Sequence, residues 1–306
     1  MIKKPNLFIV GAAKSGTTTL QTLLNRHSQI FMSPIKEPNF FSKDIETENF
    51  RNDYKKTSFL DEKEYFKKNR LEERHIAFIK KQENYLSLFK EVESELYLGE
   101  ASTSYLYSRI AAKEIYNFNP NSKIIIMLRH PIDRVISHYY MDVAAGRQKE
   151  KNVLKGIKAD FEKNRKGWGV SNLYIELSNY KTQIANYLKY FPKNQVLIID
   201  FEEFKTNQVS VMRKIQLFLG INSFEEIVGE EKRNETLVPK IGIFHYVMKI
   251  KVKFFHDFKN EKLKTFIKRI FFKKPSYDLS EDCREYLHHL LSDDINYYQS
   301  ISLEKN

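Results

Sequence analysis

Residues 7 to 20 read LFIVGAAKSGTTTL, an apolar run that passes directly into a loop rich in glycine and hydroxyl side chains. An aromatic and β-branched run that ends at Gly11 is typical of a central strand in a parallel sheet. Threonines then cap and enter a helix, in which leucines recur at helical spacing. Because the first backbone N–H groups of a helix are free to bind anions, the stretch predicts a strand, a phosphate-binding loop and a helix.

The loop has the glycine spacing of the nucleotide-binding pattern G-x-x-x-x-G-K-[ST], with Gly11 and Gly16 in the glycine positions. Thr17 stands where that pattern has lysine, and the lysine of this loop is Lys14. A loop that grips a β,γ-phosphate and a magnesium ion needs its lysine after the second glycine, so an ATPase or GTPase would lack its central residue. Lys14, Ser15 and the threonines still exceed what a plain strand-to-helix turn requires, and we interpret the loop as a phosphate site.

Strands and helices alternate along the chain, which predicts an α/β fold with a central parallel sheet flanked by helices. The expected strands are 7–10, 30–32, 97–99, 123–128 and 195–200. The expected helices are 17–27, 80–93, 108–118, 131–144, 173–191 and 207–219, with a C-terminal helix over 280–298. The polar segment 42–75 has no clear period, and we expect loops and short helices there, on the surface or over the cleft.

The composition favours one large domain over residues 1–306 that acts on an anionic partner. Lys and Arg number 51 against 39 Asp and Glu. The one cysteine, Cys283, excludes an intrachain disulfide, and no Cys/His pattern indicates a metal site. The apolar run near the start is too short for a signal peptide, and no run approaches the ~20 apolar residues of a membrane span. We therefore expect a metal-free cytoplasmic protein.

Residues 244–274 are rich in both lysine and phenylalanine, and their pattern permits a pair of basic amphipathic helices. Such helices either dock their aromatic side chains on the domain with the lysines in water, or bind an anionic membrane surface. We favour docking, and keep peripheral contact with the inner face of the membrane as the alternative.

The phosphate loop and four later segments, taken in order, resemble the sulfotransferases that use 3′-phosphoadenosine 5′-phosphosulfate (PAPS). The later segments are HSQIFMSPIKEPNFF (27–41), GEASTSYL (99–106), IIIMLRHPIDRVISHYY (124–140) and LYIELSNYKTQIANYLKYFP (173–192). The resemblance is closest to the carbohydrate branch, the heparan-sulfate-type enzymes and their bacterial relatives. It implies a fold similar to that of P-loop nucleoside kinases, PAPS as the sulfuryl donor and adenosine 3′,5′-bisphosphate (PAP) as the product.

The resemblance also implies a donor site made of two groups of residues. The 5′-phosphosulfate would be held by Lys14, Ser15, Gly16, Thr17 and Thr18. The 3′-phosphate would be held by Arg129, at the end of a predicted strand, and by Ser137 on the helix that follows. Arginine is preferred wherever one phosphate takes two hydrogen bonds. Lys240 matches a further phosphate-contacting position, although the charge run around it fits solvated surface equally well.

Glu37, in the motif KEPNFF, is the expected catalytic base. A carboxylate beside aromatic rings is partly desolvated, which raises its basicity. In heparan-sulfate-type enzymes the matching glutamate is the proposed base, and Lys14 would stabilise charge on the leaving phosphate. The family commonly has lysine where Ala101 stands here, which is a departure on the acceptor side. The residues that we expect to contact the acceptor are Lys36, Phe40, Ser102 and Tyr174.

The sequence thus predicts an enzyme that moves the sulfuryl group of PAPS to a hydroxyl or amine of a carbohydrate, such as a cell-surface polysaccharide or glycolipid. It predicts no nucleic-acid partner. Two alternatives stay open. A nucleotide or small-molecule kinase with a P-loop would turn over ATP with magnesium. A noncatalytic glycan- or membrane-binding protein would use the basic surface alone, and would not bind PAP tightly through Arg129.

Overall fold

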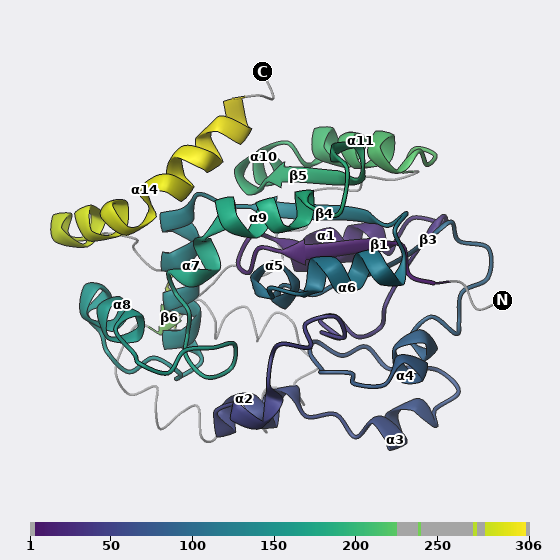
Figure 1. Ribbon diagram of the computed structural model, residues 1–306, viewed down its shortest axis with the longest axis horizontal. Coiled ribbons are helices and arrows are strands. Elements are labelled where there is room, and N and C mark those ends of the chain that lie inside the picture. Colours follow the sequence, from purple (N-terminus) through teal and green to yellow (C-terminus); the bar gives the residue numbers. More distant parts are fainter. Residues whose placement is uncertain (1–3, 225–237, 240–271, 274–278, 304–306) are drawn as a thin grey trace.

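The computed structural model describes residues 4–224, 238–239, 272–273 and 279–303 (Figure 1). Lys240 lies outside the described residues, as does the basic segment 244–274 apart from 272–273. The interpretation of that segment therefore stays a prediction.

The centre of the fold is a five-stranded parallel sheet with the strand order β2-β3-β1-β4-β5. The strands are β1 (Leu7–Gly11), β2 (Ile30–Met32), β3 (Tyr97–Ala101), β4 (Lys123–Leu128) and β5 (Val196–Asp200). Every residue of β1 is buried, because helices cover both faces of the sheet, and this explains its unbroken apolar sequence. Each expected strand is present to within two residues, and the predicted α/β fold class is confirmed.

Helices connect the strands and enclose the sheet. The longer ones described are α1 (Thr17–Leu24), α6 (Ala111–Phe118), α7 (Pro131–Ala144), α8 (Val153–Phe161), α9 (Tyr180–Leu188), α11 (Gln208–Leu219) and α14 (Glu281–Leu303). The shorter ones are α2 (Asn52–Ser58), α3 (Glu62–Phe66), α4 (Gln82–Ser87), α5 (Ser104–Tyr107) and α10 (Phe201–Thr206). Single 3₁₀ turns are η1 (Thr47–Asn49), η2 (Glu176–Ser178) and η3 (Lys193–Gln195), and β6 (Val238–Pro239) pairs antiparallel with β7 (Phe272–Lys273) beside α7.

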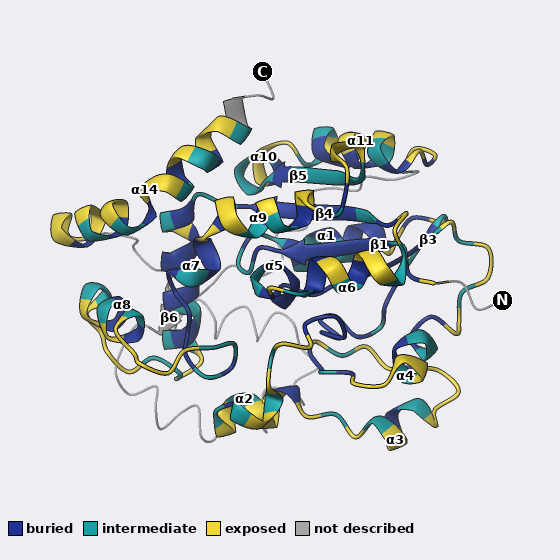
Figure 2. Cartoon of the chain, viewed as in Figure 1, coloured by how far each residue is buried: buried dark blue, intermediate teal, exposed yellow. Residues whose placement is uncertain are grey.

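Three apolar clusters hold these layers together. One face of the sheet packs against α5, α6 and α9, and the other packs against α1 and α11. A third cluster joins α7, α8 and α14 at one side of the molecule. In Figure 2 most of β1, β3, β4 and α7 is buried and β5 is mostly of intermediate exposure, whereas α6, α9 and α14 expose their outer sides.

Helix 131–144 begins and ends as expected, with Pro131 in its first turn. The expected helix 173–191 is instead the turn η2 followed by α9. Leu173 has a φ of 56°, and the carbonyl of Tyr174 accepts a hydrogen bond from the buried guanidinium of Arg134, so helical bonding begins later. Nε of Arg134 also donates to the Ser178 hydroxyl at 2.5 Å, so this buried arginine has a structural role.

Other helix boundaries differ because of local hydrogen bonds. The expected helix 108–118 begins later, as α6 at Ala111, because the side-chain oxygen of Ser108 accepts from the N–H of Ala111 at 3.0 Å before the helix starts. The expected helix 80–93 is limited to α4, after which the chain continues in turns. The C-terminal helix α14 extends to Leu303, further than predicted. Short helices do occur within 42–75, as expected.

Candidate functional site

The predicted site residues follow the carboxyl ends of three strands. The phosphate loop follows β1, the loop of Glu37 follows β2, and Arg129 follows β4. Because the strands are parallel and β1 lies between β3 and β4, these ends meet at one edge of the sheet. Ligands of open α/β sheets bind at this edge, which makes it the candidate site.

The phosphate loop is held by backbone contacts that suit its sequence. The N–H of Ala12 donates to the carbonyl of Met127 at 2.6 Å, which ties the loop to β4. Gly16 begins α1 with a φ of 84°, and a Cβ there would lie 3.0 Å from the ring of Phe201. Only glycine adopts that conformation without strain in so confined a space. Lys14 also has a positive φ, of 71°.

Two cations interact at this loop: Lys14, which belongs to it, and Arg129, which follows β4. Burial and the nearby positive charge of Arg129 lower the pKa of Lys14 to about 8, against an opposing effect of Asp142. The guanidinium of Arg129 lies 5.0 Å from the ring centroid of Phe201, and the Tyr180 hydroxyl donates to its carbonyl at 3.0 Å. A buried cation whose pKa is lowered by a neighbouring positive charge favours a bound anion, which would relieve the repulsion.

Two polar atoms of this region are buried without a hydrogen-bond partner, Oγ of Ser15 and Nε of Arg129. The Ser15 hydroxyl lies near that of Tyr180, yet makes no hydrogen bond of good geometry with it. Buried donors of this kind are rare in folded proteins and mark positions where a ligand oxygen would bind. Thr17 is buried and Thr18 half-buried in the first turn of α1, and Ser137 is buried on α7, about 9 Å along the axis from its start.

Glu37 is fixed in its loop by hydrogen bonds along the backbone. Its N–H donates to Ala101 at 2.8 Å, and its carbonyl accepts from Ala77 at 3.0 Å and from the Asn39 side chain at 2.7 Å. The side chain is buried, and Oε1 lies 2.6 Å from Nζ of Lys36 and 3.3 Å from Oγ1 of Thr103. Oε2 has no hydrogen bond within the described part of the chain.

His75 is a residue of this site that the sequence did not reveal. Ile35 and Arg74 form a parallel bridge, so the next residues on each segment, Lys36 and His75, face the same side. The side chain of His75 keeps much of its area exposed, yet desolvation lowers its pKa, as do the charges of Lys36 and Lys14, against the effect of Glu37. A single histidine in a charged segment with no helical or strand periodicity does not indicate a functional role, so the sequence did not predict it.

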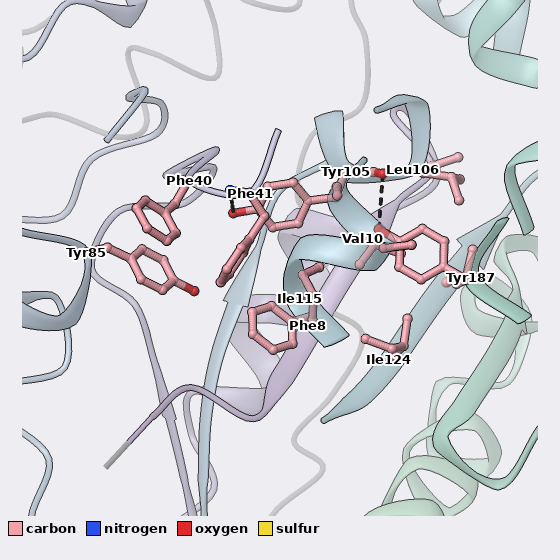
Figure 3. Close-up of a cluster of buried hydrophobic side chains, with 14 of the residues drawn as sticks. Phe8, Val10, Phe40, Phe41, Tyr85, Tyr105, Leu106, Ile115, Ile124 and Tyr187 are labelled. Atoms are coloured by element: carbon pink, nitrogen blue, oxygen red, sulfur yellow. Dashed lines mark hydrogen bonds between the residues drawn. The ribbon is translucent and has the colours of Figure 1, made fainter. Parts of the chain in front are cut away.

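The four expected acceptor contacts are all buried. Phe40 is 5% exposed and stacks on Tyr85 with ring centroids 4.3 Å apart (Figure 3). Ser102 is fully buried and donates to Glu100 at 2.7 Å. Tyr174 is 1% exposed. Lys36 is also buried, at 7% exposed, and forms an ion pair with Glu37. The acceptor roles of all four residues stay predictions.

Tyr174 belongs to a buried polar network whose charges act on Lys14. Its hydroxyl donates to Oδ2 of Asp142 at 3.1 Å, and Asp142 Oδ1 accepts from Nε of Arg147 at 2.8 Å. Asp142 is the carboxylate that opposes the fall in the pKa of Lys14. Neither Asp142 nor Arg147 was singled out from the sequence, because a single charged residue, on a helix or in the turn after it, carries no motif.

Within the described ranges, no group of three or more His, Cys, Asp or Glu side chains is arranged to hold a metal ion. Of the helices that the structure describes, none is long and apolar enough to cross a bilayer.

Comparisons with known proteins identify the family of the chain. The human bifunctional heparan sulfate N-deacetylase/N-sulfotransferase 2 is 28% identical over 224 residues, which cover 72% of this chain and 22% of that protein. The mouse heparan sulfate glucosamine 3-O-sulfotransferase 5 is 24% identical over 71% of this chain and 54% of its own length. The chain thus spans about a fifth to a half of these relatives.

Among solved structures, a sulfotransferase from Alicyclobacillus acidocaldarius superposes with a TM-score of 0.66 and 27% identity, covering 98% of this chain and 96% of that one. A family model described as the sulfotransferase family matches residues 5–226, and the predicted resemblance is thereby confirmed. This chain therefore belongs to the sulfotransferase family.

Proposed function

We propose that this protein transfers the sulfuryl group of PAPS to a hydroxyl or amine of a carbohydrate. The observation that carries the proposal is the pair of neighbouring cations, Lys14 and Arg129, beside the first turn of α1. Burial and mutual repulsion lower the pKa of Lys14 despite the opposing effect of Asp142. A phosphate or sulfate between the two cations would reverse this fall.

The residues present fit PAPS. The unpartnered Oγ of Ser15 and Nε of Arg129 are donors that phosphate oxygens would satisfy. The 3′-phosphate would be held by Arg129 and Ser137. The 5′-phosphosulfate would be held by Lys14, Ser15, Gly16, Thr17 and Thr18, with the positive end of α1 adding to the attraction.

When bound, PAPS supplies a sulfuryl group whose bond to the 5′-phosphate oxygen breaks as the acceptor oxygen or nitrogen bonds to sulfur. Glu37 would take the proton of the acceptor on Oε2, while Lys36 and Thr103 hold Oε1 in place. Lys14 would neutralise the charge that develops on the 5′-phosphate. Both groups are fixed by the backbone before any ligand binds, as electrostatic catalysis requires.

The names of the relatives support a carbohydrate acceptor. Two of them are described as acting on heparan sulfate or its glucosamine, one on nitrogen and one on oxygen. A polysaccharide or glycolipid with hydroxyl or amino groups is the class that we propose for this chain.

Transfer from radiolabelled PAPS to a panel of cell-surface glycans tests the proposal directly. PAP binding, measured by calorimetry, tests the donor site separately, and Arg129→Ala should weaken it at least ~10-fold because a charge-assisted contact is lost. Arg70→Ala, at an exposed position after α3, is the matched control. Equal PAP affinity in both variants would remove Arg129 from the donor site, and magnesium-dependent ATP turnover without sulfate transfer would favour the kinase alternative.

A further inference from the structure

Three aromatic side chains lie next to the site and have no part in the chemistry above. Tyr54 belongs to α2, Tyr107 ends α5, and Trp168, the one tryptophan of the chain, follows α8. Nε1 of Trp168 donates to the hydroxyl of Tyr54 at 2.7 Å, and the ring centroids of Trp168 and Tyr107 are 5.9 Å apart. All three side chains are partly exposed. We call Tyr54, Tyr107 and Trp168 the aromatic surface.

The aromatic surface is built by close packing of segments that are far apart in the sequence. The N–H of Arg51 donates to the carbonyl of Gly169 at 2.9 Å. Gly169 has a φ of 72°, and a Cβ there would lie 2.5 Å from the ring of Phe50. The rings of Phe50 and Tyr54 are in turn in edge contact, with centroids 5.0 Å apart. Trp168 is therefore held against α2 by its own loop, in one position.

A short helix connects the aromatic surface to the expected base. Thr103, directly before α5, donates to Oε1 of Glu37 at 3.3 Å, and Tyr107 ends that four-residue helix. The electrostatics of Tyr54 agree with this placement. The pKa of Tyr54 is raised by burial and then by the negative charge of Glu37, while Arg147 and Arg51 oppose the rise. The Tyr54 hydroxyl is thus close enough to feel the negative charge of Glu37 and the positive charges of Arg51 and Arg147. A ligand held on the aromatic surface would therefore lie close enough to Glu37 to give up a proton to it.

The two arginines give the aromatic surface a positive rim. Nη1 of Arg51 donates to Asn172 at 2.6 Å, and Nε of Arg147 donates to Asp142 at 2.8 Å. Their side chains are 30% and 28% exposed, so part of each guanidinium remains accessible to solvent. Since a guanidinium carries five N–H donors, both retain the capacity to bind an anionic group.

We propose that the aromatic surface holds a sugar ring of an anionic saccharide beside Glu37, with Arg51 and Arg147 facing its acidic groups. This inference rests on the proposed function. Tyrosine and tryptophan offer an apolar face to the C–H face of a pyranose and a polar edge for hydrogen bonds. The arginine rim complements carboxylate or sulfate groups on the neighbouring sugars.

The single tryptophan makes a direct binding test available. The intact protein, saturated with PAP, is titrated with an anionic hexasaccharide of alternating glucuronic acid and N-acetylglucosamine, and tryptophan emission is recorded. We expect a saturable change, and at least ~10-fold weaker binding of the uncharged maltohexaose. Binding of the charged hexasaccharide seen by calorimetry without a change in emission would overturn the aromatic surface. Absence of all saccharide binding, with PAP binding intact, would overturn the carbohydrate acceptor as well.

Variants separate contact with the acceptor from a structural role. Trp168→Ala should raise the KM for the hexasaccharide about tenfold and leave kcat and PAP affinity unchanged, and Trp168→Phe should recover most of the loss. Tyr116→Ala, at a tyrosine that is 37% exposed on α6, is the control. Should Trp168→Ala not fold, Tyr54→Phe removes only the hydroxyl that holds Nε1 and should still raise KM. An unchanged KM, or an equal loss of PAP affinity, would overturn the inference while leaving sulfate transfer as proposed.

Discussion

On the donor side, Lys14 and Arg129 crowd together and two buried donor atoms have no partner. On the acceptor side, Lys36 and Glu37 form an ion pair of 2.6 Å, and Thr103 adds a second hydrogen bond to the same oxygen. The donor side thus holds positive charge that a ligand would neutralise, whereas the acceptor side has neutralised its own charge. A dianion suits the first, and a hydroxyl or amine suits the second.

The two sides also differ in what builds them. The donor side consists of two strand–loop–helix units, β1 with α1 and β4 with α7, and within each unit the expected donor residues are close in sequence. The acceptor side joins segments around residues 37, 54, 75 and 168, which come from different parts of the chain. We therefore expect changes on the donor side to alter ligand affinity and its pH dependence, and changes on the acceptor side to alter turnover and the stability of the loop.

The largest effect on turnover is expected from Glu37→Gln. If this change also weakened PAP binding, the donor and acceptor sides would not be independent. Glutamine keeps the size of the side chain and an oxygen for Lys36 and Thr103, but is not a base. Turnover should fall by roughly 10²- to 10⁴-fold, the usual contribution of a general base. PAP affinity should be unchanged. The measurements are single-turnover sulfate transfer and PAP calorimetry.

Glu48→Gln is the control for that change, because Glu48 is exposed and pairs with Lys80 at 2.8 Å. Turnover of Glu37→Gln equal to that of the control would remove Glu37 from the role of base.

A smaller effect, on stability, is expected at Glu100, which supports the acceptor loop through hydrogen bonds beneath it in the core. Its carboxyl is fully buried and accepts from Tyr85 at 2.9 Å, Tyr105 at 2.7 Å and Ser102 at 2.7 Å, and Ser102 in turn accepts from the N–H of Asn39 at 3.1 Å. Burial raises the pKa of Glu100 from 4.5 to about 7. The folded state therefore favours the protonated form, and its contribution to stability is lost as pH rises from about 4.5 to about 7.

The variant Glu100→Gln lacks this titration. Relative to the variant, the wild-type free energy of unfolding should fall by about 2 kcal/mol between pH 5 and pH 8, from the size of the shift. Chemical denaturation at both pH values measures the difference. A constant difference would show that the carboxyl of Glu100 titrates alike in the folded and unfolded protein.

Sequence reasoning predicted the residues of the donor side because their signals are local. Glycine spacing, an apolar run and Pro131 at a helix start are all readable without knowing the fold. It missed the contact of Trp168 with Tyr54, since 114 residues separate them and only tertiary packing joins them. Phe40 illustrates the same limit, because the sequence predicts an aromatic ring beside Glu37 but not that it would stack on Tyr85 in the core. Residue type is readable from sequence, whereas exposure is a property of the packed chain.

The smallest expected effect is a pH dependence confined to the donor side. With a pKa of about 8 in the free protein, Lys14 is mostly protonated at pH 7 and mostly neutral at pH 9. Only the cation attracts the phosphates of PAP, whose own titration is complete below this range. PAP affinity should therefore fall about tenfold from pH 7 to pH 9, equivalent to about 1.4 kcal/mol. Calorimetry measures it, and the slope should vanish in Lys14→Ala but persist in Glu37→Gln, since the Lys36–Glu37 pair lies on the other side. A slope retained in Lys14→Ala would assign the titration to another group and remove the distinction between the two sides.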